Sequence, residues 1–316
     1  MQIEPGLNRL LYKICQAYYE EGLTQKEIGE RLGLSRIKVS RLLQQARDLQ
    51  VVQITLNRPV FHHSEMEQAL EKKYQLDEVI VVKPASHDSD EIIKHALAPA
   101  AAECLLRNLD KTDSVGVSWG STMAAIVDAL PVEHLPDVTI VQCLGGMASL
   151  HSPTNTIDVT RRMAEKLGAK PLILPAPGLV TSKTLHDALL ENATIKEALS
   201  LAAACDIAVV GIGVPTLEGI LGKQPILNEK EIARLKNNGA AGDICLRFYN
   251  AEGLPADDDL DNRTIGLTLN QIRSIRRVIG VAGGEYKVKA IRAALESKLV
   301  KVLVTDDLVA QRLLES

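Results

Sequence analysis

Residues 24–43 read T-Q-K-E-I-G-E-R-L-G-L-S-R-I-K-V-S-R-L-L, and this stretch contains the start and end signals of two short helices. Thr24, with Glu27 three residues later, forms a capping box that predicts a helix start. Gly33 can adopt the positive φ that ends this helix, and Ser35 can cap the next one. Two short helices joined by a glycine-containing turn form a helix-turn-helix, whose second helix enters the major groove of DNA.

The second helix has an aliphatic side and a polar side. At about 100° per residue, the side chains of Val39, Leu42, Leu43 and Ala46 share the inner side. Arginine and lysine can donate to guanine, glutamine can pair with adenine, and an exposed isoleucine can contact a thymine methyl group. The residues that we expect to contact DNA are Gln25, Ser35, Arg36, Ile37, Lys38, Ser40, Arg41 and Gln44. The alternative is a capped helical hairpin with a solvated polar face and no DNA role.

The charges of the chain are unevenly distributed. At 316 residues the chain is long for a single hydrophobic core, and its net charge is −4. Residues 1–58 nevertheless hold nine lysines and arginines against six acids, so this segment is basic and the remainder is acidic. A basic segment on an acidic body fits a DNA-binding domain over residues 1–58 joined to a second domain over residues 59–316.

The cysteine spacing and the lengths of the apolar stretches argue against a zinc-binding, disulfide-bonded or membrane-spanning protein. The five cysteines are never in a C-x-x-C spacing and predict neither a zinc site nor a disulfide. No apolar stretch is long enough to span a bilayer, and the N-terminus does not resemble a signal peptide. We therefore expect a cytoplasmic protein without a membrane partner, a metal or a cofactor.

Short apolar strands alternate with helices from residue 79 onward. They are almost uncharged, as expected for a parallel sheet covered on both faces, which predicts an α/β domain. Before it we expect a helix over 7–17, a strand over 52–56 that could form a wing, and a helix starting at a capping box of Ser64 and Glu67. Strands are expected over 79–82, 115–118, 138–144, 171–174, 207–211, 278–282 and 300–304, and helices over 92–106, 122–130, 158–167, 195–203, 228–236, 287–295 and 307–314.

Glycine-marked loops follow four of the expected strands. Since ligands of open α/β sheets bind beyond the carboxyl ends of the strands, we expect a ligand site there. Backbone amides, hydroxyls and a lysine suit a phosphate and the hydroxyls of a sugar. The alternative at each loop is glycine used for turn geometry alone. The loops are Ser118-Trp119-Gly120-Ser121-Thr122, Gly145-Gly146, Gly211-Ile212-Gly213 and Gly283-Gly284-Glu285 with Lys287.

The sequence resembles the SorC type of sugar-binding transcriptional regulator, a bacterial family also called SorC/DeoR-like. The resemblance covers nearly the whole chain. It includes the helix-turn-helix stretch, G-V-S-W-G-S-T, L-G-G, the segment around Asn155 that leads to L-P-A-P, D-I-A-V-V-G-I-G, G-D-I-C-L-R-F-Y around Asp243, and V-A-G-G-E-Y-K with Lys287. The combination is specific, although any one piece is not.

The resemblance implies a winged-helix-like DNA-binding domain joined to an effector domain similar in fold to phosphosugar isomerases and deaminases. It implies double-stranded operator DNA and a phosphorylated sugar or polyol as partners, and a homodimer or homotetramer. In this family Asp243 would bind sugar hydroxyls and Lys287 a phosphate or a nearby oxygen. The effector-binding residues implied are Gly120, Ser121, Thr122, Gly145, Gly146, Asn155, Asp243 and Lys287.

A sugar-phosphate isomerase or deaminase is the alternative function. Such an enzyme needs a positioned general base. The seven histidines lack metal-binding spacings, and His151 alone lies near the expected site. Asp243 could act as a base, but no second acid is evident. We therefore expect a regulator of a carbohydrate or polyol operon, in which effector binding changes the affinity for operator DNA. Induction and co-repression both remain open.

Overall fold

The computed structural model describes residues 5–54, 63–146, 154–215 and 226–315. The chain separates into two compact units, Met1–His62 and His63–Ser316. The predicted domain boundary between residues 58 and 59 lies outside the described residues and stays a prediction. Within the described residues, none of the helices combines the length and the apolar content that a membrane span requires.

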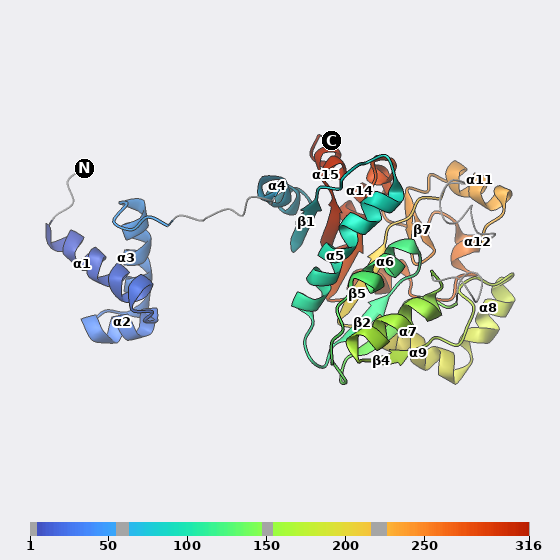
Figure 1. Ribbon diagram of the computed structural model, residues 1–316, viewed down its shortest axis with the longest axis horizontal. Helices are drawn as coiled ribbons and strands as arrows, with labels where there is room; N and C mark the ends of the chain where they lie inside the picture. Colours follow the sequence, from blue (N-terminus) through green and yellow to red (C-terminus); the bar gives the residue numbers. More distant parts are fainter. Residues whose placement is uncertain (1–4, 55–62, 147–153, 216–225, 316) are drawn as a thin grey trace. The chain divides into compact units, whose positions relative to one another are not determined.

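The first unit is helical, as predicted. It contains α1 (Pro5–Cys15), the π-helix η1 (Gln16–Glu20), α2 (Gln25–Leu32) and α3 (Arg36–Asp48) (Figure 1). Its fully buried core includes Leu11, Ile14, Ile28 and Val39.

The strand expected over residues 52–56 is wrong where the structure describes it. Residues 51–54 form no strand. The backbone amides of Val51 and Val52 turn back to the carbonyl oxygen of Ala46, and both side chains pack against the helical core. Residues 55 and 56 lie outside the described residues. Of the alternating apolar residues, Val52 packs against the helical core and Ile54 is 57% exposed, so the alternation does not mark a strand here.

The second unit is built on a seven-stranded sheet in the order β1-β9-β8-β5-β2-β3-β4, and every neighbouring pair is parallel. This confirms the predicted α/β class. Consecutive residues of a strand face opposite sides, so Val209 belongs to one hydrophobic core and Val210 to the other. The strands are β1 (Glu78–Val82), β2 (Ser114–Val117), β3 (Thr139–Gln142), β4 (Lys170–Leu172), β5 (Ile207–Gly211), β8 (Arg277–Val281) and β9 (Val302–Asp306).

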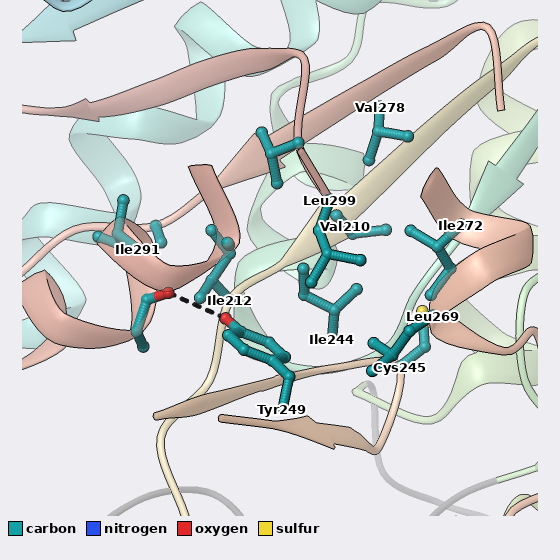
Figure 2. Packing of buried hydrophobic residues seen from close by; sticks show 14 of the residues in the cluster. Val210, Ile212, Ile244, Cys245, Tyr249, Leu269, Ile272, Val278, Ile291 and Leu299 are labelled. Atoms are coloured by element: carbon teal, nitrogen blue, oxygen red, sulfur yellow. Dashed lines mark hydrogen bonds between the residues drawn. The ribbon is translucent and has the colours of Figure 1, made fainter. Parts of the chain in front are cut away.

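Helices cover both faces of this sheet (Figure 1). Those that pack on one face are α5 (Asp90–Asn108), α6 (Ser121–Ala129) and α7 (Thr156–Leu167). The opposite face is covered by α4 (Ser64–Tyr74), α11 (Glu229–Asn237), α13 (Leu269–Ser274), α14 (Val288–Glu296) and α15 (Asp307–Leu314). In that second core Tyr249 is fully buried, and its hydroxyl donates to the carbonyl oxygen of Ala290 at 3.0 Å (Figure 2).

The predicted capping box at Ser64 is wrong. The N-cap of α4 is His63, which makes no capping hydrogen bond through its side chain. Glu67 instead accepts from the backbone amide of Val81 at 3.0 Å, and Glu71 accepts from that of Val79 at 3.0 Å. Because β1 is an edge strand, these amides have no further strand to pair with. The two glutamates therefore satisfy the open edge of the sheet.

Several elements were not predicted. Helices α8 (Lys183–Leu190), α12 (Asp258–Asp261) and α13 are short and had no strong periodic pattern, whereas α9 (Ala193–Ala203) was predicted over 195–203. Residues 242–249 form a hairpin outside the main sheet, with β6 (Gly242–Ile244) antiparallel to β7 (Arg247–Tyr249). Its two turn residues, Cys245 and Leu246, both have positive φ, at 53° and 59°. Side chains with a Cβ adopt this conformation at a cost in strain.

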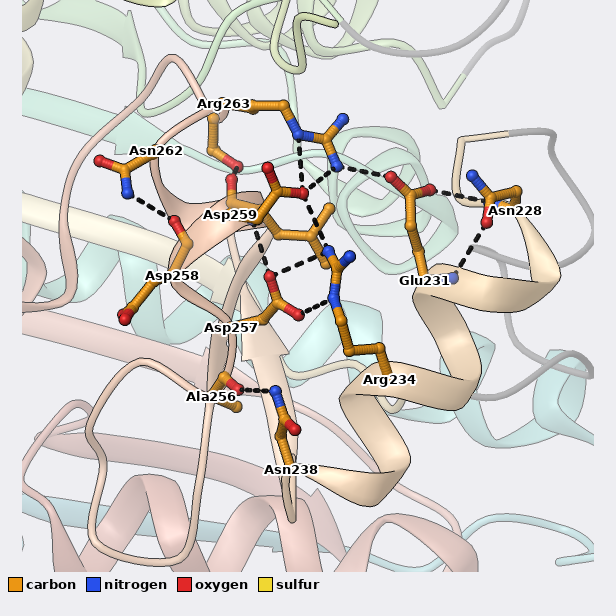
Figure 3. A network of polar contacts seen from close by, with 12 residues as sticks. Asn228, Glu231, Arg234, Asn238, Ala256, Asp257, Asp258, Asp259, Asn262 and Arg263 are labelled. Atoms are coloured by element: carbon orange, nitrogen blue, oxygen red, sulfur yellow. Dashed lines mark hydrogen bonds and ion pairs between the residues drawn. The ribbon is translucent and has the colours of Figure 1, made fainter. Parts of the chain in front are cut away.

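Charged side chains hold the segment around this hairpin together. Arg234 of α11 contacts the carboxylates of Asp257 and Asp259, and Arg263 contacts Asp259 and Glu231 (Figure 3). These bonds join α11 to α12.

Arg247 is buried, with 3% of its surface exposed. Its guanidinium donates to the Asp261 carboxylate and to the carbonyl oxygens of Asp261, Thr264, Gly266 and Leu267. One side chain thus satisfies several carbonyl groups of the segment 261–267.

Candidate functional site

The caps that begin the helix-turn-helix are those predicted. The Thr24 hydroxyl accepts from the amide of Glu27, whose carboxylate accepts from the amide of Thr24 at 2.8 Å. Gly33 ends α2 with φ of 67°. The Ser35 hydroxyl accepts from the amide of Lys38 at 3.2 Å and starts α3.

The two sides of α3 are also as predicted. Val39, Leu42, Leu43 and Ala46 are buried. Of the eight residues expected to contact DNA, Gln25 is half-buried and the other seven are exposed, with Ile37 at 68%. These seven are Ser35, Arg36, Ile37, Lys38, Ser40, Arg41 and Gln44.

The cations of this face are available to a ligand. Among the described residues, Arg36, Lys38 and Arg41 form no ion pair within 4 Å. Gln44 is engaged, because its amide nitrogen donates to Asp48 at 2.9 Å and its oxygen accepts from Arg47 at 2.6 Å. Gln44 must exchange these bonds to pair with a base, whereas the three cations need not.

In the second unit a cavity of about 330 Å³ lies at the carboxyl ends of β2, β5 and β8. Its volume is at the lower end of the range for small-molecule sites. Strands β2 and β5 are neighbours, but the chain passes through β3 and β4 before it returns to β5. The cavity therefore lies at the point where the strand order reverses, which is where open α/β sheets bind ligands. Its walls come from residues 90–97, 118–122, 211–214, 243–245 and 282–287.

The loop after β2 presents the start of a helix to the cavity. Gly120 is the N-cap of α6 and has φ of 104°, which residues with a Cβ rarely adopt. Ser121 and Thr122 follow it in the first turn and line the cavity. First-turn amides lack acceptors within the helix and lie at the positive end of its dipole, so this terminus suits an anion.

Asp243 is fixed in the wall by a backbone bridge. It exchanges two 3.0 Å hydrogen bonds with Gly213, and a Cβ on Gly213 would lie 2.2 Å from the Asp243 carboxylate. Gly213 is therefore required by this close approach. Burial raises the pKa of Asp243 to about 6, and the amide of Leu246 and the ammonium of Lys287 oppose that rise. The strained turn of the hairpin thus supplies a hydrogen bond to this carboxylate.

Lys287 supplies a positive charge to the same cavity. Burial lowers the pKa of its ammonium, and the carboxylates of Asp90 and Asp243 oppose this change. The ammonium lies 5.6 Å from the ring centre of Tyr286, whose hydroxyl donates to Asp90 at 2.8 Å. A half-buried ammonium beside carboxylates can bind a phosphate or hydroxyl oxygen.

Three residues implied by the family resemblance do not line this cavity. Gly145 and Gly146 donate to the carbonyl oxygens of Ile265 and Ala176 at 2.9 and 2.8 Å. Asn155 caps α7, where its side-chain oxygen accepts from the amide of Ile157 at 3.0 Å. The structure thus brings together Gly120, Ser121, Thr122, Asp243 and Lys287. The other three residues form backbone hydrogen bonds or cap a helix. Effector binding by any of the eight stays a prediction.

The contribution of α5 to the cavity was not predicted. Asp90, Glu91 and Lys94 of its first turns line the cavity, and Lys94 pairs with Glu91 at 2.6 Å. The sequence signal for these residues was a cluster of charges at a helix start that follows a strand. The same pattern is also typical of a solvated surface. Among the described residues no histidine lines the cavity, and His151 lies outside them.

Comparisons with known proteins agree with this arrangement. A family described as "Putative sugar-binding domain" matches residues 58–315, and the family "Sigma-70, region 4" matches residues 11–48. The deoxyribonucleoside regulator of Bacillus subtilis is 33% identical and covers 96% of this chain and 97% of its own. The chain belongs to the SorC/DeoR-like family of sugar-binding transcriptional regulators.

Further members of this family match over the full length. The sorbitol operon regulator of Klebsiella pneumoniae is 30% identical and covers 97% of this chain and 98% of its own. The crystal structure of full-length SorC from Klebsiella pneumoniae has a TM-score of 0.71 and 29% identity, covering 97% of this chain and 99% of its own. The relatives are transcriptional regulators, and this SorC/DeoR-like chain is therefore a regulator rather than an isomerase or deaminase.

Proposed function

We propose that this regulator binds operator DNA through α3 and that a phosphorylated sugar or polyol in the cavity controls this binding. The observation that carries the proposal is the meeting of three kinds of group in one cavity. These are the open start of α6 at Ser121, the ammonium of Lys287 and the carboxylate of Asp243. The first two suit a phosphate, and the third suits hydroxyl groups, which donate to carboxylates.

The names of the relatives support the chemical class of this effector. One relative is a sorbitol operon regulator and another is a deoxyribonucleoside regulator. Sorbitol is a polyol, and a deoxyribonucleoside contains a sugar.

The regulator is further proposed to act as a homodimer or homotetramer. A helix-turn-helix protein reads two half-sites of a palindromic operator with two copies of its recognition helix. An effector that binds one arrangement of the copies better than another changes the operator affinity, whether by induction or by co-repression.

Thermal unfolding with a panel of sugar and polyol phosphates tests the effector proposal. A ligand of the folded state at 100 times its Kd adds about 2.7 kcal/mol of stability and raises the Tm. The sole tryptophan, Trp119, lines the cavity and is 6% exposed, so the same ligand should change its fluorescence. The unphosphorylated sugar should bind much more weakly. If no phosphorylated compound changes either signal in the folded protein, the effector proposal is wrong.

A pair of lysine variants tests the site assignment. Lys287→Met should weaken the binding of the phosphorylated ligand roughly ten- to a hundredfold, since it removes a charge-assisted hydrogen bond. Lys289→Met is the matched control, because Lys289 is exposed two residues further along and should bind as the wild type does. Equal affinities of the two variants would contradict the role of Lys287. Mobility shifts of operator DNA with and without the ligand then give the direction of control.

A further inference from the structure

A second cluster of ligating groups lies outside the cavity lining. It consists of His87 from the segment between β1 and α5, Asp306 at the end of β9 and Asp307 at the start of α15. The Nε2 atom of His87 lies 2.7 Å from Oδ1 of Asp307 and 3.8 Å from Oδ1 of Asp306. One ligand atom of each residue lies within 4.8 Å of the other two.

The carboxylate of Asp306 is held rigidly. Its Oδ2 accepts from the amide of Gly284 at 2.7 Å, and its Oδ1 accepts from the amide of Val309 at 2.9 Å. A carboxylate oxygen has two lone-pair directions, so each oxygen retains one for a further partner.

Asp306 is also buried at the N-cap of α15, where the Lys287 ammonium acts on it through space but makes no ion pair with it. It is 0% exposed, and among the described residues no lysine or arginine nitrogen lies within 4 Å of its carboxylate. His87 is the cationic group at that distance, and only when protonated. Buried charges in proteins are paired or coordinate metals. At 3.8 Å, His87 is too far from Asp306 for a hydrogen bond, so the imidazole does not fill the lone pairs that the two backbone amides leave open.

We propose that His87, Asp306 and Asp307 bind a divalent first-row transition metal ion. Imidazole suits zinc, and carboxylate suits manganese, so this mixed set favours these ions over magnesium, which prefers oxygen ligands alone. Metal–ligand bonds of about 2.0–2.2 Å place neighbouring ligand atoms about 3–3.5 Å apart. The observed separations bracket this value, so small side-chain movements close the site. Two carboxylates then balance the charge of the ion.

This site was invisible in the spacing of the sequence, which predicted no metal. His87 and Asp307 are 220 positions apart, and only the pairing of β1 with β9 brings them together. Through Asp306 the ion would stiffen the turn at Gly284, three residues before Lys287. The three ligating residues do not line the cavity, and the test of this site needs no sugar.

Thermal unfolding and calorimetric titration of the full chain, first treated with a chelator, test the site. Zn²⁺ or Mn²⁺ should raise the Tm and bind with one ion per chain. The same concentration of Mg²⁺ should leave the Tm unchanged. His87→Ala should raise the Kd of the metal at least about tenfold, since even the loss of outer partners of metal ligands costs that much. This variant should still fold, because His87 is half-exposed in a connecting segment.

His186→Ala is the matched control. The Nδ1 atom of His186 lies 3.0 Å from the Asp187 carboxylate, and no second carboxylate of the described residues joins this pair in a metal-binding group. This variant should bind the metal as the wild type does. The proposal is overturned if neither ion raises the Tm, if Mg²⁺ raises it equally, or if the two histidine variants bind the metal alike.

Discussion

The recognition helix and the effector cavity differ in how they are assembled from the chain. The groups that form the helix-turn-helix come from one stretch of 20 residues, and each cap lies three residues from its partner. The cavity takes its walls from five segments spread from residue 90 to residue 287. A local unit can be predicted from neighbouring residues, whereas a site built across a sheet depends on strand order. The comparison also implies that a substitution which disrupts one of the two regions should leave the other functional.

The largest expected effect is on the stability of the first unit. Ile28 is 0% exposed, so Ile28→Ala should reduce the free energy of unfolding of this unit by about 2–5 kcal/mol. Operator binding should be lost, while the fluorescence response to effector persists. Ile37→Ala is the control, because Ile37 is 68% exposed and its truncation should change stability by less than about 0.5 kcal/mol. Denaturant unfolding measures both, and equal losses would contradict the assignment of the two faces.

The next effect concerns pH and belongs to the second unit. The folded state keeps the proton of Asp243 up to a pKa of about 6, whereas an ordinary aspartate loses it near 3.8. The folded state therefore binds more protons between these values, and its stability falls as pH rises through that window. Asp243→Asn should remove this fall and be more stable at pH 7 by up to roughly 2–3 kcal/mol, while effector affinity decreases.

Denaturant unfolding at pH 4, 5, 6 and 7 checks this expectation. Asp137→Asn is the control, because the Asp137 side chain is 70% exposed and its removal should leave the pH profile unchanged. A wild-type slope in Asp243→Asn would show that this carboxyl does not titrate as described.

The smallest of the three effects is on DNA affinity. Arg41→Ala should weaken operator binding by about 1–3 kcal/mol, the value of one good base contact, and leave the effector response intact. Arg161→Ala in α7 removes an equal charge from the other unit, from a side chain that is 52% exposed, and should not change operator affinity. Mobility shifts compare them. An unaltered affinity in Arg41→Ala would show that α3 does not read the operator through this side.

The elements predicted correctly are those whose signals are local. The cap at Ser35 and the buried side of α3 needed only residues within one or two helical turns. The strands of the main sheet were also predicted correctly, since strands covered on both faces are continuously apolar. The errors arose where a local pattern served a distant partner. Glu67 resembles half of a capping box, but its carboxylate serves the edge strand β1.

The cavity could be predicted only in part for the same reason. Gly120 and Lys287 closely follow strands in the sequence, so their position in the ligand site could be predicted. Lys94 could not be placed, because a charged helix face has the same pattern whether it meets water or a ligand. The turn at Cys245 and Leu246 was equally hidden, since non-glycine residues with positive φ contradict local preference.

The hydrogen bonds of Arg247 restrict where residues can be inserted into or deleted from this protein. Its guanidinium serves carbonyl groups at fixed places along residues 261–267. Surface loops usually tolerate insertions, because their backbone groups can turn to water. Here one inserted residue would move some carbonyl groups away from the Arg247 guanidinium, which is buried and cannot follow them. These carbonyl groups and the guanidinium would then remain buried without hydrogen-bond partners. Within the second unit, this is where natural insertions and deletions should be rarest.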